Sequence, residues 1–201
     1  MSESLVRRHG LEAFLAQPVR SRSGDPGVTV TVRGDFGHIN LRGRASDNGF
    51  LDSAGHALGQ ALPVEPNTIS TGEHHVCWLG PDEWLVVTPV AGAAELAARL
   101  EEASASMHAA LNNISGGQVA LMLRGAKCRE LLARGCPLDL HPREFKPGDC
   151  AQSGLAKANI LIASLDDAPT FMLVVRRSFS DYLCRWIAHA GGDAGIVFDS
   201  A

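Results

Sequence analysis

Apolar residues recur at helical spacing in several segments of the chain. Residues 93–107 are rich in Ala, Leu, Glu and Arg, and Leu96 and Leu100 lie four apart on one face, which predicts a helix. Residues 126–134 predict a second and shorter helix, because two adjacent leucines fall in this segment and Gly135 follows at a position favoured just beyond a helix end.

The clearest helical pattern lies near the end of the chain. Ser178 is placed to cap the first turn, and Asp181 follows three positions later, which approximates a capping box. The pair Gly191 and Gly192 ends the pattern. A weaker helix is expected over residues 50–58. The apolar stripe of the clearest helix consists of Phe179, Tyr182, Leu183, Trp186, Ile187 and Ala190.

Other segments alternate apolar and polar residues or form short apolar runs, and both patterns are typical of strands. Two of these segments flank residues 80–83, Gly-Pro-Asp-Glu, whose turn chemistry predicts a β-hairpin. The expected strands are residues 28–32, 38–42, 76–79, 84–88, 118–124, 156–163 and 171–177.

The order of these elements favours an α+β fold. It runs strands, helix, strand, helix, strands, helix, and lacks the regular alternation of a doubly wound parallel sheet. We therefore expect helices packed on mixed, largely antiparallel sheet. Residues 1–27 are interpreted as an N-terminal arm and surface loop, and residues 28–201 as the folded domain.

Composition and charge argue against several classes of function. The chain of 201 residues is 45% hydrophobic and 20% charged, as in globular proteins. Its net charge of −4 argues against broad binding of nucleic acid, which requires a basic face. No signal peptide is visible, and no apolar run approaches the ~20 residues that a bilayer requires. A cytoplasmic location without membrane contact is expected.

The cysteines show no metal-binding or disulfide pattern. They are odd in number, scattered, and without a C-x-x-C pair. We expect reduced thiols that are mostly buried and behave as small hydrophobic side chains. The five residues are Cys77, Cys128, Cys136, Cys150 and Cys184.

Motifs for nucleotide, metal or nucleophilic chemistry are missing from the sequence. Neither G-x-x-x-x-G-K-[ST] nor a G-x-G-x-x-G that opens a helix after a strand occurs. His74 and His75 are adjacent and would point to opposite faces of a strand, which favours surface or interface histidines over metal ligands. Ser115 does not fit G-x-S-x-G and is interpreted as a turn serine.

Two charged pairs leave alternatives open. Asp82 and Glu83 fall in the predicted hairpin turn, where a solvated or capping role is the default. Burial of either carboxylate would raise its pKa and make it a candidate acid or base. Arg176 and Arg177 precede a helix start, where they could bind an anion or face solvent or a partner. No catalytic, cofactor-binding or metal-binding residue is assigned.

Several short motifs that carry no obvious chemistry occur along the chain in an order that can be compared with known families. Residues 78–85, W-L-G-P-D-E-W-L, form the longest and most specific one. The others are residues 40–43 (N-L-R-G), 114–116 (I-S-G), 121–125 (L-M-L-R-G), 131–140 (L-L-A-R-G-C-P-L-D-L), 145–148 (F-K-P-G) and 175–183 (V-R-R-S-F-S-D-Y-L). Together they resemble the γ subunits of heterotetrameric sarcosine oxidases, in the family's order, over residues 39–186.

The resemblance implies a subunit of an oxidoreductase complex, with no catalytic site on this chain. Such complexes demethylate sarcosine to glycine, reduce oxygen to hydrogen peroxide and pass the methyl carbon to tetrahydrofolate, which links sarcosine catabolism to one-carbon metabolism. FAD, FMN, NAD, zinc and tetrahydrofolate are then expected on partner α, β and δ subunits, and none on this chain. The implied fold is that of glycine-cleavage T-proteins, with two interleaved lobes packed against the large α subunit.

An apolar face is expected where such a subunit meets its partner. Tryptophans are common interface anchors, but they are equally common in cores, and both alternatives stay open for the two in the hairpin. The alternative function is a free-standing folate-binding or aminomethyltransferase-like protein, which measurable tetrahydrofolate affinity would favour. The candidate interface residues are Trp78, Trp84, Leu138, Leu140 and Phe145.

Overall fold

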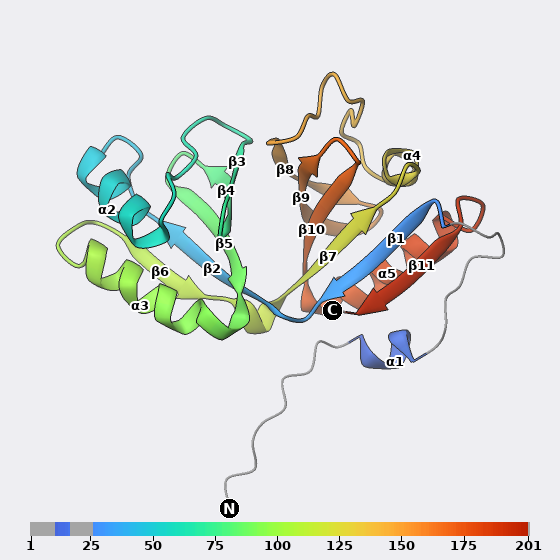
Figure 1. Ribbon diagram of the computed structural model, residues 1–201, viewed down its shortest axis with the longest axis horizontal. Coiled ribbons are helices and arrows are strands. Elements are labelled where there is room, and N and C mark those ends of the chain that lie inside the picture. Colours follow the sequence, from blue (N-terminus) through green and yellow to red (C-terminus); the bar gives the residue numbers. More distant parts are fainter. Residues whose placement is uncertain (1–10, 17–25, 201) are drawn as a thin grey trace, which may run out of the picture.

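The computed structural model describes residues 11–16 and 26–200 and has two β-sheets, each forming one lobe with helices on its outer side (Figure 1). The predicted α+β class with two interleaved lobes is confirmed. Most of the arm and loop assigned to residues 1–27 lies outside the described residues.

The first sheet has six strands, and the outer helices pack on it through a large apolar core. Only the pair β1–β11 is parallel, and all other neighbours are antiparallel. In spatial order the strands are β11 (Ile196–Ser200), β1 (Val28–Arg33), β7 (Gln118–Arg124), β10 (Thr170–Arg176), β9 (Ala158–Asp166) and β8 (Cys150–Leu155). The helices of this lobe are α1 (Glu12–Leu15), α4 (Cys128–Ala133) and α5 (Arg177–Ala190).

The second sheet has five strands, all antiparallel to their neighbours. Its outer face carries α2 (Asn48–Leu58) and α3 (Ala93–Ser104) over a separate apolar core. In spatial order the strands are β3 (Ile69–Thr71), β4 (His75–Gly80), β5 (Glu83–Pro89), β2 (Phe36–Arg42) and β6 (Ala110–Asn113). Two single turns of 3-10 helix, η1 (Val90–Gly92) and η2 (Ser115–Gly117), complete the elements described.

The two lobes are interleaved along the chain. β1 belongs to the six-stranded sheet, residues 36–113 then form the five-stranded sheet, and β7 returns to lie beside β1. The inner faces of both sheets supply a third cluster of buried residues, which includes Leu85 and Val87 from one sheet and Met172 and Val174 from the other. The lobes therefore share a buried core between their sheets.

All four predicted helices are present, but the expected cap of the last one is wrong. Helix α5 begins at Arg177, one residue before Ser178, and its N-cap is Arg176, which makes no side-chain capping bond. The cause is that Arg176 still pairs with Gln118 as the last residue of β10, so the strand runs directly into the helix. Helix α2 is capped as its sequence suggests, with the Asp47 carboxylate accepting from the Phe50 N–H at 3.2 Å.

The predicted hairpin is confirmed, because β4 and β5 pair up to Gly80 and Glu83. The strand expected over residues 156–163 corresponds to β9, which begins two residues later, at Ala158, because residues 156–157 form the turn after β8. Ala156 lies in the turn between them with φ of 54°, a conformation uncommon for a residue with a Cβ. Strands β3, β6 and β11 are not anticipated by the sequence patterns.

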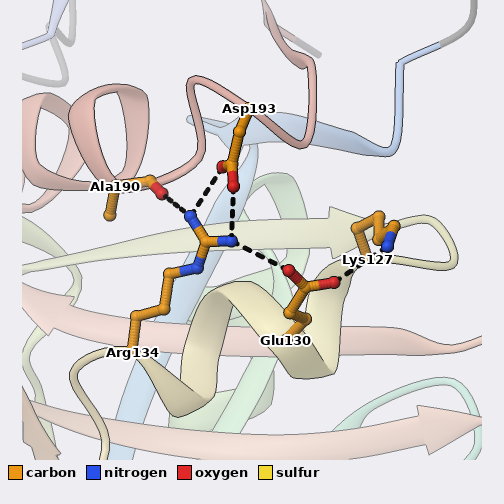
Figure 2. A network of polar contacts seen from close by, with 5 residues as sticks. All are labelled: Lys127, Glu130, Arg134, Ala190 and Asp193. Atoms are coloured by element: carbon orange, nitrogen blue, oxygen red, sulfur yellow. Dashed lines mark hydrogen bonds and ion pairs between the residues drawn. The ribbon is translucent and has the colours of Figure 1, made fainter.

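A network of polar side chains fastens α4 to the loop that follows α5 (Figure 2). Arg134 donates two hydrogen bonds to the Asp193 carboxylate, at 2.6 and 2.9 Å, and one to the Ala190 carbonyl. It also donates to Glu130 at 2.8 Å, and Glu130 accepts from Lys127 at 2.9 Å. The hydrogen bonds from Arg134 hold the pKa of Asp193 at about 2, so the network stays ionised at neutral pH.

Replacing Gly135 with alanine is expected to lower the free energy of unfolding by about 2 kcal/mol. A Cβ at this position would lie 2.5 Å from Cζ2 of Trp186 and 3.2 Å from the Ala156 nitrogen, so the indole would have to move. Urea denaturation measures the change. The matched control is Gly116→Ala, where a Cβ meets nothing within 4 Å. Equal losses in the two variants would contradict the packing argument.

Candidate functional site

A cleft of about 670 Å³ opens between the two sheets. Strands β2, β4 and β5 line it from one side, and β7, β8, β9 and β10 from the other. Its floor is apolar, with Leu85 and Val174 among the lining residues. This volume lies within the range of small-molecule sites. The polar side chains around the cleft are Asn40, Glu83, Gln118, Gln152, Ser153, Asn159 and Arg176.

Four of these seven polar side chains are engaged within the protein, and one of them is Ser153, whose hydroxyl accepts from the Cys136 thiol at 3.7 Å. Asn40 donates from Nδ2 to the Glu83 carboxylate at 2.8 Å, and Gln152 donates from Nε2 to the Leu79 carbonyl at 2.9 Å. In the described part of the chain, the side chains of Gln118, Asn159 and Arg176 have no hydrogen-bond or ion-pair partner. The cleft thus offers two free amides and one free guanidinium to whatever enters it.

A buried histidine lies deeper between the sheets. His38 is two residues before Asn40 on β2, on the same face of the sheet, and its side chain is 1% exposed. Neither ring nitrogen has a hydrogen-bond partner among the described residues. Burial lowers the pKa of His38 to about 4, so the ring is neutral at physiological pH.

The expectation that the two adjacent histidines lie at the surface is wrong for His74, which is buried, whereas His75 is partly buried. Nδ1 of His74 lies 2.9 Å from the Thr88 hydroxyl, whereas His75 pairs in register with Val87 and its ring faces Phe36. Burial lowers the pKa of both rings. No cluster of three metal-ligating side chains occurs within residues 11–16 and 26–200.

Ser115 and the two acidic turn residues have structural contacts. The Ser115 hydroxyl accepts the His38 N–H at 2.9 Å and donates to the Asn113 side chain at 2.6 Å, as a turn serine does. The Asp82 carboxylate is exposed and lies 3.6 Å from Arg42. Glu83 alone of the acidic pair reaches the cleft, where Asn40 donates to it.

The five residues expected at a partner interface separate into two groups. Trp84, Leu140 and Phe145 are buried, which favours the core alternative for them. Trp78 and Leu138 are partly exposed at the edges of the two main cores. For these two residues the interface role stays a prediction.

The segment that contains Leu140 and Phe145 is fixed from inside the lobe. Arg129 on α4 donates from Nη1 to the carbonyls of Leu140 and Phe145, at 2.6 and 3.0 Å. Its guanidinium also lies 5.0 Å from the centre of the Phe171 ring. The motifs over residues 131–148 therefore position a loop against the core.

The sequence patterns do not reveal the cleft. Its free polar groups, Gln118, Asn159 and Arg176, come from three different strands and form no motif in the chain. Only the pairing of β7, β9 and β10 brings them to one opening. Two signals were available in the sequence. The alternation of β2 places Asn40 between apolar neighbours, and Arg176 was marked as a possible anion-binding residue.

Comparison with known proteins gives one family. The sequence profile described as "Sarcosine oxidase, gamma subunit family" matches residues 42–193. The sarcosine oxidase subunit gamma of Corynebacterium sp. (strain P-1) is 30% identical over 154 residues, which cover 76% of this chain and 74% of that protein. The subunit gamma of Corynebacterium sp. (strain U-96) is 26% identical over 194 residues, covering 94% and 93%.

Solved structures show the same fold. A chain of the heterotetrameric sarcosine oxidase from Corynebacterium sp. U-96, in complex with pyrrole 2-carboxylate, superposes with a TM-score of 0.84 at 24% identity, covering 94% of this chain and 96% of that one. The glycine cleavage system aminomethyltransferase T from Bartonella henselae superposes with a TM-score of 0.63 at 14% identity, covering 87% and 48%. No helix in the described ranges combines the length and apolar character needed to cross a membrane.

Proposed function

Because this chain belongs to the sarcosine oxidase, gamma subunit family, we propose that it is the non-catalytic γ subunit of a heterotetrameric sarcosine oxidase. The observation that carries the proposal is the extent of the match, since residues 42–193 include strands of both sheets and the cores on them. What is shared with the family is therefore most of both lobes, without β1, β11 and nearly all of β2.

In this proposal the chain contributes structure and its partners contribute chemistry. The complex oxidises sarcosine to glycine, reduces oxygen to hydrogen peroxide and transfers the methyl carbon to tetrahydrofolate. FAD, FMN, NAD, zinc and tetrahydrofolate are bound by the α, β and δ subunits, and the assembly works in the cytoplasm. The large α subunit is the direct partner of this chain.

The alternative of a free-standing folate-binding or aminomethyltransferase-like protein gains no support from the comparisons. The likeness to aminomethyltransferase T covers about half of that enzyme's length and, at 14% identity, shows a shared fold alone. The cleft between the sheets holds polar groups, but nothing in it selects folate over another ligand. Tetrahydrofolate binding is therefore treated as an outcome of the test below.

Co-expression with the neighbouring oxidase subunits tests the proposal. The complex is purified through a tag on the large subunit, with and without this chain, and its size, flavin content and sarcosine-dependent peroxide production are measured. Co-elution of this chain, and a lower yield of complex when it is omitted, would support the γ subunit assignment. A chain that elutes alone and leaves the oxidase unchanged would overturn it, and tetrahydrofolate affinity of the isolated chain would then favour the alternative.

Trp78→Ala is expected to weaken assembly with the large subunit by about tenfold or more, because partly exposed tryptophans are frequent interface anchors. Its effect on the stability of the isolated chain is expected to stay near 1 kcal/mol, because the ring is only partly buried. Titration with the purified large subunit measures the affinity of assembly. Phe179→Ala, which removes another exposed aromatic ring, is the control. An unchanged affinity in Trp78→Ala would exclude this residue from the interface.

A further inference from the structure

Two cysteines from different sheets meet in the shared core. Cys77 lies on β4 of the five-stranded sheet, and Cys150 begins β8, the edge strand of the six-stranded sheet. Both side chains are 0% exposed, both thiols are free, and both belong to the buried cluster between the sheets. Cys77 and Cys150 are far apart in the sequence but belong to the same buried cluster.

The contacts of the two thiols place them side by side. Sγ of Cys150 donates to the Thr68 carbonyl at 3.1 Å and lies 3.7 Å from the carbonyl of Trp78, the residue after Cys77. The Cys150 N–H donates to the Asn67 carbonyl at 2.7 Å, which fixes the backbone at this point. A hydrogen bond with the Cys150 thiol, together with burial, raises the pKa of Cys77. The same hydrogen bond lowers the pKa of Cys150.

The cleft ends beside this pair. Leu79 and Gln152, which line the cleft, each lie two residues beyond one of the cysteines and therefore on the same face of its strand. Leu85, another lining residue, pairs in register with Cys77. The hydrogen bond from Gln152 to the Leu79 carbonyl joins the two strands at this position. One side-chain hydrogen bond thus closes the end of the cleft next to the thiols.

We propose that Cys77 and Cys150 form a peroxide-sensitive thiol pair whose oxidation joins the two sheets by a disulfide. Cys150 attacks hydrogen peroxide as the thiolate, so its sulfur is oxidised to a sulfenic acid and the O–O bond breaks with release of hydroxide, which takes up the thiol proton as water. The Cys77 sulfur then displaces the sulfenic oxygen as a second water. In total, two thiols and one hydrogen peroxide give one disulfide and two waters, and a dithiol reductant reverses the reaction.

Two of the three remaining cysteines provide an internal contrast. Cys128 and Cys184 are buried in the core of the six-stranded lobe, where burial raises the pKa of each thiol to about 12. Among the described residues, neither thiol contacts a second thiol. Neither cysteine therefore has a partner that could convert its sulfenic acid into a disulfide. The idea that the oxidase itself supplies the peroxide rests on the proposed function. The reactivity of the Cys77–Cys150 pair toward peroxide does not depend on it.

Peroxide titration of the full-length chain tests the inference. After treatment and alkylation of free thiols, mass spectrometry of peptides is expected to find a Cys77–Cys150 peptide pair lighter by two hydrogens, which a dithiol reductant abolishes. The melting temperature is expected to rise by several degrees, because the link closes a long loop of the chain. Gln152→Ala should accelerate oxidation several-fold by opening the end of the cleft.

Two control variants and two further outcomes decide the interpretation. Cys150→Ser should abolish both the linked peptide and the rise in melting temperature, while Cys184→Ser should leave both unchanged. If Cys77 and Cys150 are alkylated freely after peroxide treatment of the folded chain, the inference is overturned. It is equally overturned if the linked peptides come from two different chains, as a mixture of isotope-labelled and unlabelled protein would reveal.

The same readout inside the complex separates this inference from the proposed function. A disulfide formed with added peroxide but not during sarcosine turnover would leave the thiol pair intact and count against the oxidase as the source of oxidant. Failure with added peroxide would overturn the thiol pair alone, whatever the complex does.

Discussion

Replacing Trp84 with alanine is expected to lower the free energy of unfolding by about 4 kcal/mol, a large part of the stability of an ordinary domain. The ring is 0% exposed in the core of the five-stranded lobe, and its centre lies 5.8 Å from that of Phe50. Its Nε1 donates to the Pro63 carbonyl at 2.7 Å. Truncation would leave both a cavity and a carbonyl without its donor.

The other tryptophan of the same hairpin is the matched control. Trp78 faces Trp84 across the strand pair, but it is only partly buried, so Trp78→Ala should cost far less stability. Urea denaturation of both variants, followed by tryptophan fluorescence and circular dichroism, measures the difference. Similar losses for the two residues would contradict their assignment to core and edge. Trp84→Phe should recover part of the loss, because it restores apolar volume but not the hydrogen bond.

Lowering the pH from about 7 to about 4 is expected to remove about 3 kcal/mol of stability through His38 alone. Burial lowers its pKa from 6.5 to about 4, so the unfolded chain binds a proton in this window that the folded chain does not. Stability is therefore fully present above the unfolded pKa and falls as the pH drops through the window. His74 and His75, whose pKa values are also lowered by burial, act in the same direction.

His38→Leu tests this expectation, because it removes the titrating ring and its two unpaired buried nitrogens. The variant should lose less stability than the native chain between neutral pH and pH 4, and it should be at least as stable at neutral pH. Urea denaturation at a series of pH values gives the change of the unfolding free energy with pH. His108→Leu alters an exposed histidine and should leave that slope unchanged. Parallel slopes for the native chain and His38→Leu would show that His38 is hydrated or paired in solution.

The parts of the fold that the sequence predicts are those in which local pattern and burial agree. Helix α5 is an example, since its apolar stripe supplies Leu183 and Ile187 to the core of its lobe. Strand β6 is an opposite case, because most of its residues are exposed at a sheet edge and no alternation marks them. The expected start of β9 was two residues early because the turn at Ala156 carries no glycine or proline signal of its own.

The candidate site was harder to predict than the fold, for a physical reason. Apolar residues such as Trp84 and Phe145 look the same in a sequence whether they fill a core or meet a partner, and only their burial distinguishes the two roles. The cleft depends on pairing between strands that are distant in the chain, so Gln118 and Asn159 have no reason to stand out. The family motifs, in contrast, were recognisable because they fix local turns and close packing, as at Gly135.

The parallel pairing of β1 with β11 has a consequence for how the protein is made. Val28, Val30 and Val32 are among the first core residues to leave the ribosome, yet β1 obtains its partner on one side only when residues 196–200 have emerged. Until then one edge of β1 remains open, and an apolar strand edge can pair with another nascent chain. The six-stranded lobe therefore cannot close before β11 has been made, and the yield of folded subunit should respond to chaperones that hold β1.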